Sequence, residues 1–138
     1  MSEADALVYH LTPASALRRH VEARGYAPPS LAAKGFIHCT ATRARTLQVA
    51  ADYYAGLGEP LVVLAIDPAR LRARLVFEAP APIAGGGTAH LADGALFPHL
   101  YGALNLDAVV GAGALARAGG GFAWPAALEP LAAWLAPA

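Results

Sequence analysis

Six consecutive apolar residues, Leu61–Ile66, constrain the fold of this chain more than any other feature. A strand with one solvated face alternates apolar and polar residues, whereas a strand covered on both faces is apolar throughout. Asp67 and Pro68 follow directly, and this pair predicts an aspartate cap with proline at the first position of a short helical turn. We therefore expect a central buried strand with other elements packed on both of its sides.

Shorter apolar runs predict the remaining elements. Strands are expected at residues 7–11, 36–39, 75–78, 97–101 and 104–110, with an extension of the last one toward residue 115 left open. Helices are expected at 13–24, 30–34, 42–54 and 124–135, with Thr12, Ser30 and either Thr40 or Thr42 as N-caps. Because helices come early, strands come late and the two do not alternate regularly, the order favours an α+β fold or a split-sheet α/β fold. No Gly-x-Gly-x-x-Gly or Walker loop is present, which argues against those nucleotide sites.

The length of 138 residues indicates one domain, which we expect to span residues 1–117. Residues 79–95 are rich in Pro, Gly and Ala and predict a flexible surface loop of the length that sometimes serves as a lid. Residues 118–138 are expected to form a glycine-rich linker and an amphipathic helix. Its apolar face, which either docks on the domain or self-associates, contains Trp124, Leu128, Leu131 and Leu135.

The overall charge balance does not favour a nucleic-acid or membrane partner. Lys plus Arg number 10 and Asp plus Glu also number 10, so no strong overall field favours nucleic acid or an anionic membrane. Residues 18–45 nevertheless hold six Lys and Arg side chains against one acidic residue, Glu22. That cluster fits a small anionic ligand as well as a polymer, but a solvated basic face is the more usual origin of such a cluster.

The cellular location is expected to be the cytoplasm. One cysteine cannot form an internal disulfide, which favours a reducing compartment. The N-terminus is acidic and lacks the basic region of a signal peptide, and no apolar run approaches the roughly 20 residues of a membrane span. We expect a soluble protein with no membrane partner.

Five histidines are the main candidates for chemistry. His20 and His90 lie in a helix expected to be exposed and in a flexible loop, which leaves His10, His38 and His99. Three imidazoles suffice for catalytic zinc, but these three are far apart and form no His-x-His or His-x-x-x-His pair, so no metal is expected. Cys39 adjoins His38, but neighbouring side chains on a strand point to opposite faces, which favours a buried structural cysteine.

The same alternation pairs each of two histidines with a threonine. His10 with Thr12, and His38 with Thr40, share a strand face at the start of a helix, where free backbone N–H groups favour anions. Such an arrangement can bind ribose hydroxyls, amides and phosphates. The alternative is that the hydroxyls are ordinary helix caps and the histidines are hydrogen-bonded core residues.

Several segments together resemble the bacterial and plant domain-of-unknown-function-952 family over roughly residues 7–112. They are Val8-Tyr9-His10-Leu11-Thr12, Pro29-Ser30-Leu31, Gly35-Phe36-Ile37-His38-Cys39-Thr40, Ile66-Asp67, and Phe97-Pro98-His99-Leu100-Tyr101-Gly102 with Leu104-Asn105. That resemblance implies no established activity.

The family in turn resembles the ADP-ribosyltransferase superfamily, whose members bind NAD in the cleft of a split, mostly antiparallel β-sheet. His10-Leu11-Thr12 is similar to the His-Gly-Thr that ends its first strand, with Leu11 in place of glycine. His38-Cys39-Thr40 is similar to the His-x-Ser of the tRNA 2′-phosphotransferase branch. The superfamily's catalytic glutamate has no clear equivalent: His99 or Tyr101 occupies its region, and Glu78 is the nearest acid on a strand.

The resemblance implies a cleft that binds NAD or an ADP-ribose-like nucleotide. His10 and Thr12 would hold the ribose or the nicotinamide amide, His38 and Thr40 the remaining ribose or a phosphate, and His99 and Tyr101 the far side. If the protein is an ADP-ribosyl- or phosphotransferase-like enzyme, His10, His38 and His99 are the expected catalytic residues, and an RNA end stays open as a partner. The alternatives are a non-catalytic module with structural histidines, or one that dimerises through its C-terminal helix, and, less favoured, a metal-dependent hydrolase.

Overall fold

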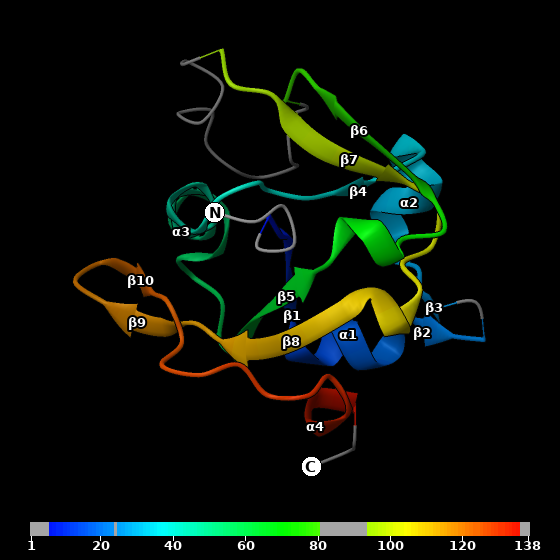
Figure 1. The fold of residues 1–138 in the computed structure, drawn as a ribbon. Helices are drawn as coiled ribbons and strands as arrows, with labels where there is room; N and C mark the ends of the chain where they lie inside the picture. Colours follow the sequence, from blue (N-terminus) through cyan, green and yellow to red (C-terminus); the bar gives the residue numbers. More distant parts are fainter. Residues whose placement is uncertain (1–5, 24, 81–93, 136–138) are drawn as a thin grey trace.

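The structure, a computed structural model, describes residues 6–23, 25–80 and 94–135. The described residues form mixed helices and strands, as the α+β prediction requires (Figure 1). In chain order the elements are β1 (Val8–Pro13), α1 (Ala14–Arg19), β2 (Val21–Glu22), β3 (Gly25–Tyr26), α2 (Pro29–Lys34), β4 (Ile37–His38), α3 (Arg43–Tyr54), β5 (Leu61–Ile66), η2 (Pro68–Arg70), β6 (Arg74–Glu78), β7 (Phe97–Tyr101), η4 (Leu106–Ala108), β8 (Val109–Ala114), β9 (Ala116–Ala118), β10 (Gly121–Ala123) and α4 (Ala132–Leu135).

Two three-stranded antiparallel sheets form the framework. One has the strand order β1-β5-β8 and the other β4-β7-β6. Two short hairpins, β2–β3 and β9–β10, are attached to them. In Figure 1 the β4-β7-β6 sheet lies above the β1-β5-β8 sheet, and a bridge between Tyr9 and Thr40 joins them.

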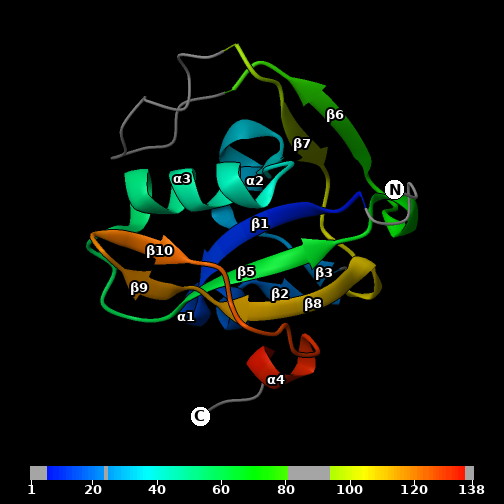
Figure 2. The same ribbon diagram turned by 60° about the vertical axis from the view of Figure 1, so that its left-hand side comes forward.

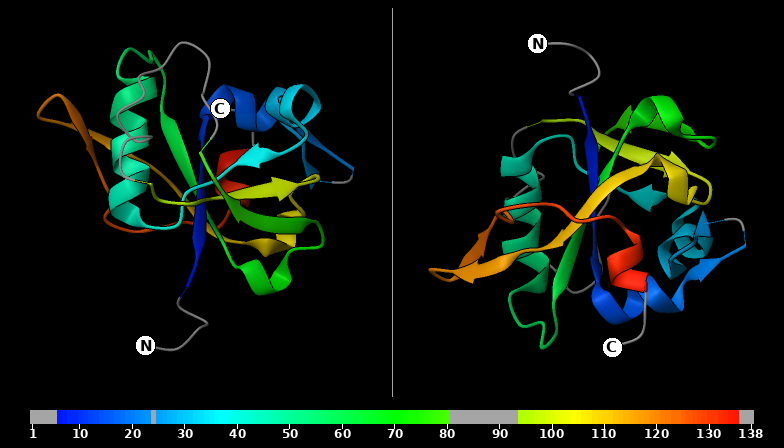
Figure 3. Two further views of the ribbon diagram at one scale, coloured as in Figure 1. Left: turned by 90° about the horizontal axis from the view of Figure 1, so that it is seen from above. Right: turned by 60° about the horizontal axis from the view of Figure 1, so that its bottom comes forward.

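Strand β5 is buried at every residue, which confirms the reading of its apolar run. One of its faces packs with α1 and α4 in a core that includes Leu17 and Leu131. The other face packs with α3 in a second core that includes Val49 and Ala50. Viewed from above, α3 lies on one side of β1, and α1 and α2 lie on the other (Figure 3). Covering both faces is what excludes polar residues from β5.

Local capping signals explain the best-predicted helices. Thr42 caps α3, and its side chain accepts a hydrogen bond from the backbone N–H of Arg45. Asp67 caps η2 in the same way through the N–H of Ala69. Thr12, in contrast, makes no cap: β1 continues through Pro13, and α1 begins without a side-chain cap. Ser30 is the second residue of α2, after Pro29.

The helix expected to run to residue 24 ends at Arg19, and a tight hairpin follows it. Gly25 has a φ of 121°, and a Cβ on it would lie 2.1 Å from the Leu104 carbonyl oxygen. This close approach lets Tyr26 and Leu104 exchange two backbone hydrogen bonds of 2.9 Å. The glycine therefore serves a contact with a distant part of the chain, not the end of a helix.

The C-terminal predictions need the largest correction. The strand expected at 104–110 begins at Val109, after η4. Residues 119–121, expected as a linker, belong to the β9–β10 hairpin, which lies against α3 (Figure 2). The tail helix spans four residues, because Pro125 and Pro130 interrupt the periodic segment.

The tail's apolar side chains are used within the chain: Leu131 is buried in the core, and Trp134 and Leu135 pack against it. No helix in the described ranges is long and apolar enough to cross a membrane. Most of the expected 79–95 loop, residues 81–93 with His90, lies outside the described residues.

Candidate functional site

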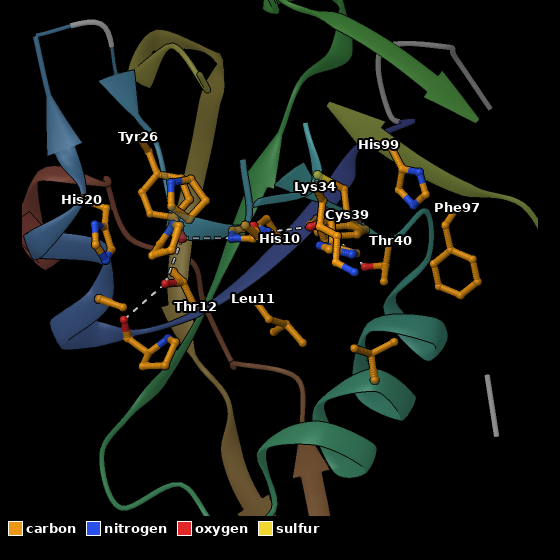
Figure 4. Close-up of a pocket in the computed structure, with 18 of the residues that line it drawn as sticks. His10, Leu11, Thr12, His20, Tyr26, Lys34, Cys39, Thr40, Phe97 and His99 are labelled. Carbon is orange, nitrogen blue, oxygen red and sulfur yellow. Dashed lines mark hydrogen bonds between the residues drawn. The ribbon is translucent and has the colours of Figure 1, made fainter. Parts of the chain in front are cut away.

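A cavity of about 410 Å³ lies where the two sheets separate. Five of the predicted site residues line it: His10, Thr12, His38, Thr40 and His99. His20 and Tyr26 lie at one end of the cavity, and Phe97 and His99 lie at the other (Figure 4). The volume is within the range of about 300–1,000 Å³ that is typical of small-molecule sites.

The cavity follows the open edge of β1. Tyr9 and Thr40 exchange two backbone hydrogen bonds of 2.8 Å, but the next pair of the same ladder, Leu11 and His38, forms none. Because alternate residues of a strand bond to opposite sides, the peptide N–H and C=O of Leu11 point away from β5. They bind no partner among the described residues. The separation of β1 from β4 thus exposes one donor and one acceptor to the cavity.

His10 bridges the opening between the strands and is held through both ring nitrogens. Its Nδ1 donates to the His38 carbonyl at 2.6 Å, which replaces the missing backbone bond. Its Nε2 lies 3.0 Å from the Tyr26 hydroxyl, which in turn lies 3.1 Å from Thr12 Oγ1. Burial lowers the pKa of His10 from 6.5 to about 4, although the bond to the His38 carbonyl raises it.

A neutral His10 ring determines where the protons of this network lie. With Nδ1 donating, Nε2 is an acceptor, so the single proton of Tyr26 goes to it. Thr12 then donates to the Tyr26 oxygen in preference to its longer, 3.3 Å contact with the Pro13 carbonyl. The chain of hydrogen bonds from Thr12 to His38 is complete without a ligand. His10 therefore holds the two walls of the cavity together.

His99 is held differently, through a carboxylate. Its Nδ1 lies 2.8 Å from Oε1 of Glu78, which also accepts a hydrogen bond from the Tyr101 hydroxyl. The bonds from Tyr101 and then His99 lower the pKa of Glu78, and the bond to Glu78 raises the pKa of Tyr101. Tyr101, expected to line the far side of the cavity, is not among the lining residues and supports Glu78 instead.

His38 and Thr40 reach the cavity from the end of β4. The His38 ring is 4.9 Å from the ring of Phe36 and 5.8 Å from that of His99, between ring centroids. Thr40 Oγ1 lies 2.6 Å from Thr46 Oγ1, which donates to the Thr42 carbonyl at the start of α3. These bonds anchor Thr40 to the helix while its side chain remains on the cavity wall.

Cys39 also lines the cavity, but as a buried thiol. Burial raises its pKa to about 12, so it stays protonated at neutral pH, and thiolate chemistry is disfavoured. In the described ranges no group of three or more His, Cys, Asp or Glu side chains is arranged to hold a metal ion. The polar groups that the described residues bring to the cavity are imidazole, hydroxyl and peptide groups and the ammonium group of Lys34.

The cavity carries no negative charge among its described lining residues. They include no Asp or Glu but do include Lys34 from the end of α2 and His20 from the end of α1 (Figure 4). Sequence reasoning set His20 aside as exposed, whereas it is half-buried at one end of the cavity. It also missed Tyr26, because a two-residue strand has no periodicity that could reveal it.

The fold is similar to that of solved structures of one bacterial protein. The X-ray structure of Protein CC0527 from Caulobacter crescentus matches with a TM-score of 0.65 at 24% identity, over 93% of this chain and 97% of that chain. A double mutant of the same protein gives a TM-score of 0.65 at 23% identity, over the same shares of both chains. At this identity the likeness shows a shared fold. No curated protein matches the chain.

The family assignment is direct. Residues 11–112, well over half of the chain, match the family described as "Protein of unknown function (DUF952)". The matched range includes five of the six predicted site residues and begins one residue after the sixth, His10; the five are Thr12, His38, Thr40, His99 and Tyr101. The chain belongs to the DUF952 family.

Proposed function

We propose that the cavity between β1 and β4 binds NAD or an ADP-ribose-like nucleotide. The observation that carries the proposal is the opened edge of β1, where Leu11 presents one peptide N–H and one C=O to the cavity. A primary carboxamide, such as that of nicotinamide, carries the complementary acceptor and donor. Backbone N–H and C=O groups that lie in a cavity without partners raise the free energy of the ligand-free protein. A ligand that forms hydrogen bonds with both groups removes this penalty.

The remaining polar groups suit the other parts of such a ligand. His38 and Thr40 lie next to the opened edge. The His38 ring can bond to a ribose hydroxyl, and Thr40 Oγ1, whose own proton goes to Thr46, can accept a hydrogen bond from one. Lys34 and His20 supply cationic or donor groups for a phosphate, and no carboxylate in the described lining repels one. We assign His10 and Thr12 to shaping the site, because their hydrogen bonds are already made within the protein.

Calorimetric titration tests the proposal. NAD, ADP-ribose and nicotinamide are titrated separately into the wild-type protein and into His38→Ala. We expect NAD to bind and His38→Ala to weaken it at least about tenfold, or about 1.4 kcal/mol. The substitution removes the ring from the cavity but keeps the His38 carbonyl that holds His10, so the fold is retained.

A surface variant controls for non-specific effects. Arg72→Ala removes an exposed side chain that pairs with Asp107, away from the cavity lining, and is expected to bind NAD as the wild type does. Absence of binding of both NAD and ADP-ribose to the wild-type protein would rule the proposal out. Equal affinity of the wild type and His38→Ala for NAD would show that the ligand does not bind in this cavity.

A further inference from the structure

We infer that His99, positioned by Glu78, is the proton-accepting catalytic residue of this cavity, and that it acts on a water molecule or ligand hydroxyl that attacks the ribose of the bound nucleotide. The inference rests on the proposed function. To nucleotide binding it adds a catalytic role for His99, a positioning role for Glu78, and a reaction at the ribose. Its basis is how differently the structure holds the three imidazoles that line the cavity.

His99 has the geometry of an oriented base. The residue is 2% exposed, and its Nδ1 lies 2.8 Å from Oε1 of Glu78. Because a carboxylate only accepts, Nδ1 carries the proton and Nε2 carries the lone pair. Phe36 stacks on the imidazole with ring centroids 4.0 Å apart and planes 17° apart, which prevents the ring from turning.

The Nε2 of His99 is the nitrogen left for a ligand. No partner for it exists among the described residues, and His99 lines the cavity. His10 is different, since accepting a proton at Nε2 would break its bond from Tyr26 and charge a fully buried ring. A base must be able to take up a proton without losing a structural bond, which favours His99 over His10.

The charged and titratable groups around His99 are consistent with this role. Glu78 faces it from β6, Tyr101 lies beside it on β7, and His38 faces it from β4. Arg74 lies over the Tyr101 ring at 5.4 Å and belongs to the same cluster. Glu78 is thus the carboxylate that can stabilise the imidazolium formed when Nε2 accepts a proton.

The step balances with water or a hydroxyl compound as the second reactant. The oxygen of the attacking O–H forms a bond to C1′ of the ribose, and the proton of that O–H goes to His99 Nε2. The bond between C1′ and the nicotinamide nitrogen breaks, and its electron pair leaves with nicotinamide, which departs as a neutral molecule. His99 then returns the proton to solvent.

The test combines a spectroscopic and a kinetic measurement on the full chain. Imidazole ¹⁵N NMR of the wild type is expected to show His99 in the Nδ1–H form, with both tautomers present in Glu78→Leu. Release of nicotinamide from NAD is then followed by chromatography, with and without methanol as an added acceptor. We expect His99→Gln to keep NAD affinity and lose at least about 100-fold in rate. Glu78→Gln should lower kcat about tenfold with KM unchanged.

The outcomes separate this inference from the proposed function. Failure of the wild type to bind NAD by calorimetry overturns the inference, and failure to bind both NAD and ADP-ribose overturns the proposed function as well. Binding without nicotinamide release, or release that His99→Gln leaves unchanged, overturns the inference and leaves nucleotide binding in place. Should His99→Gln fail to fold, the two variants of the half-exposed Glu78 still test the inference. An unchanged kcat in Glu78→Gln and an unchanged His99 tautomer in Glu78→Leu would contradict the positioning role of Glu78.

Discussion

His10 and His99 line the same cavity and are held by different means. His10 is fixed by neutral partners, the His38 carbonyl and the Tyr26 hydroxyl, and has no ring nitrogen left. His99 lines the cavity, is fixed on one side by the carboxylate of Glu78, and has no partner for Nε2 among the described residues. The comparison teaches that proximity to a cavity does not make an imidazole reactive. The partner of each ring nitrogen decides whether a histidine holds the walls or can act on a ligand.

The largest expected effect concerns His10 and pH. Its pKa is about 4 in the folded protein and 6.5 in the unfolded chain, so the unfolded chain binds the extra proton first as pH falls. The contribution of His10 is fully present above pH 6.5, declines at about 1.4 kcal/mol per pH unit below it, and levels off near pH 4. The total loss is about 3 kcal/mol. Urea unfolding at a series of pH values from 7.5 to 4 measures it.

His10→Gln is the matched variant for this experiment. Its amide can still donate to the His38 carbonyl but cannot titrate, so we expect a protein that is less stable at pH 7.5 and whose stability falls less steeply between pH 6.5 and 4. Equal slopes for the two proteins in that window would mean that His10 is charged in the folded state. The proton arrangement from Thr12 to His38 would then be wrong.

The sequence predicts those elements that local contacts determine and misses those that depend on residues distant in the chain. The apolar run of β5 and the threonine cap of α3 are local signals. The sequence predicts the buried strand and limits the cap to Thr40 or Thr42, of which the structure uses Thr42. The β2–β3 hairpin was missed because the close approach of Gly25 to Leu104, a residue far along the chain, stabilises it. The C-terminal helix was overestimated because spacing was weighed above Pro125 and Pro130.

The candidate site was predicted in position but not in detail. Strand alternation pairs His10 with Thr12 and His38 with Thr40, and the family resemblance implies that the two pairs share a cleft. The structure brings these four residues to one cavity with His99. Hydrogen-bond partners cannot be read from spacing, because they depend on tertiary contacts. The pairing of His99 with Glu78 across β6 and β7 is such a contact, as is the bond from Tyr26 to His10.

Removing the Tyr26 hydroxyl tests how much its hydrogen bond to His10 contributes to stability. Tyr26→Phe leaves Nε2 of His10 buried without a donor, and we expect a loss of about 1–2 kcal/mol in the free energy of unfolding at pH 7.5. Tyr54→Phe is the control, since that hydroxyl, also at the cavity, has no hydrogen-bond partner among the described residues. It should change stability by less than about 0.5 kcal/mol. Equal effects of the two variants would show that Tyr26 contributes by packing alone.

The smallest effect on stability is expected on the His99 side, at Tyr101. The Tyr101 hydroxyl is the main cause of the lowered pKa of Glu78, so Tyr101→Phe should raise that pKa toward 4.5, as measured by NMR of the Glu78 carboxyl carbon.

A carboxyl group whose pKa is lowered by folding stabilises the folded protein at pH values above its unfolded-state pKa. It loses that contribution as the pH falls through its folded-state pKa. The lowered pKa of Glu78 therefore affects stability only below about pH 4.5, whereas that of His10 affects it between 6.5 and 4. At pH 7.5 the urea midpoint of Tyr101→Phe should match the wild type, because Glu78 is half-exposed and keeps its bond from His99. A large loss of stability at that pH would show that the hydrogen bonds around His99 stabilise the fold as those around His10 do. The proposed difference between the two histidines would then be wrong.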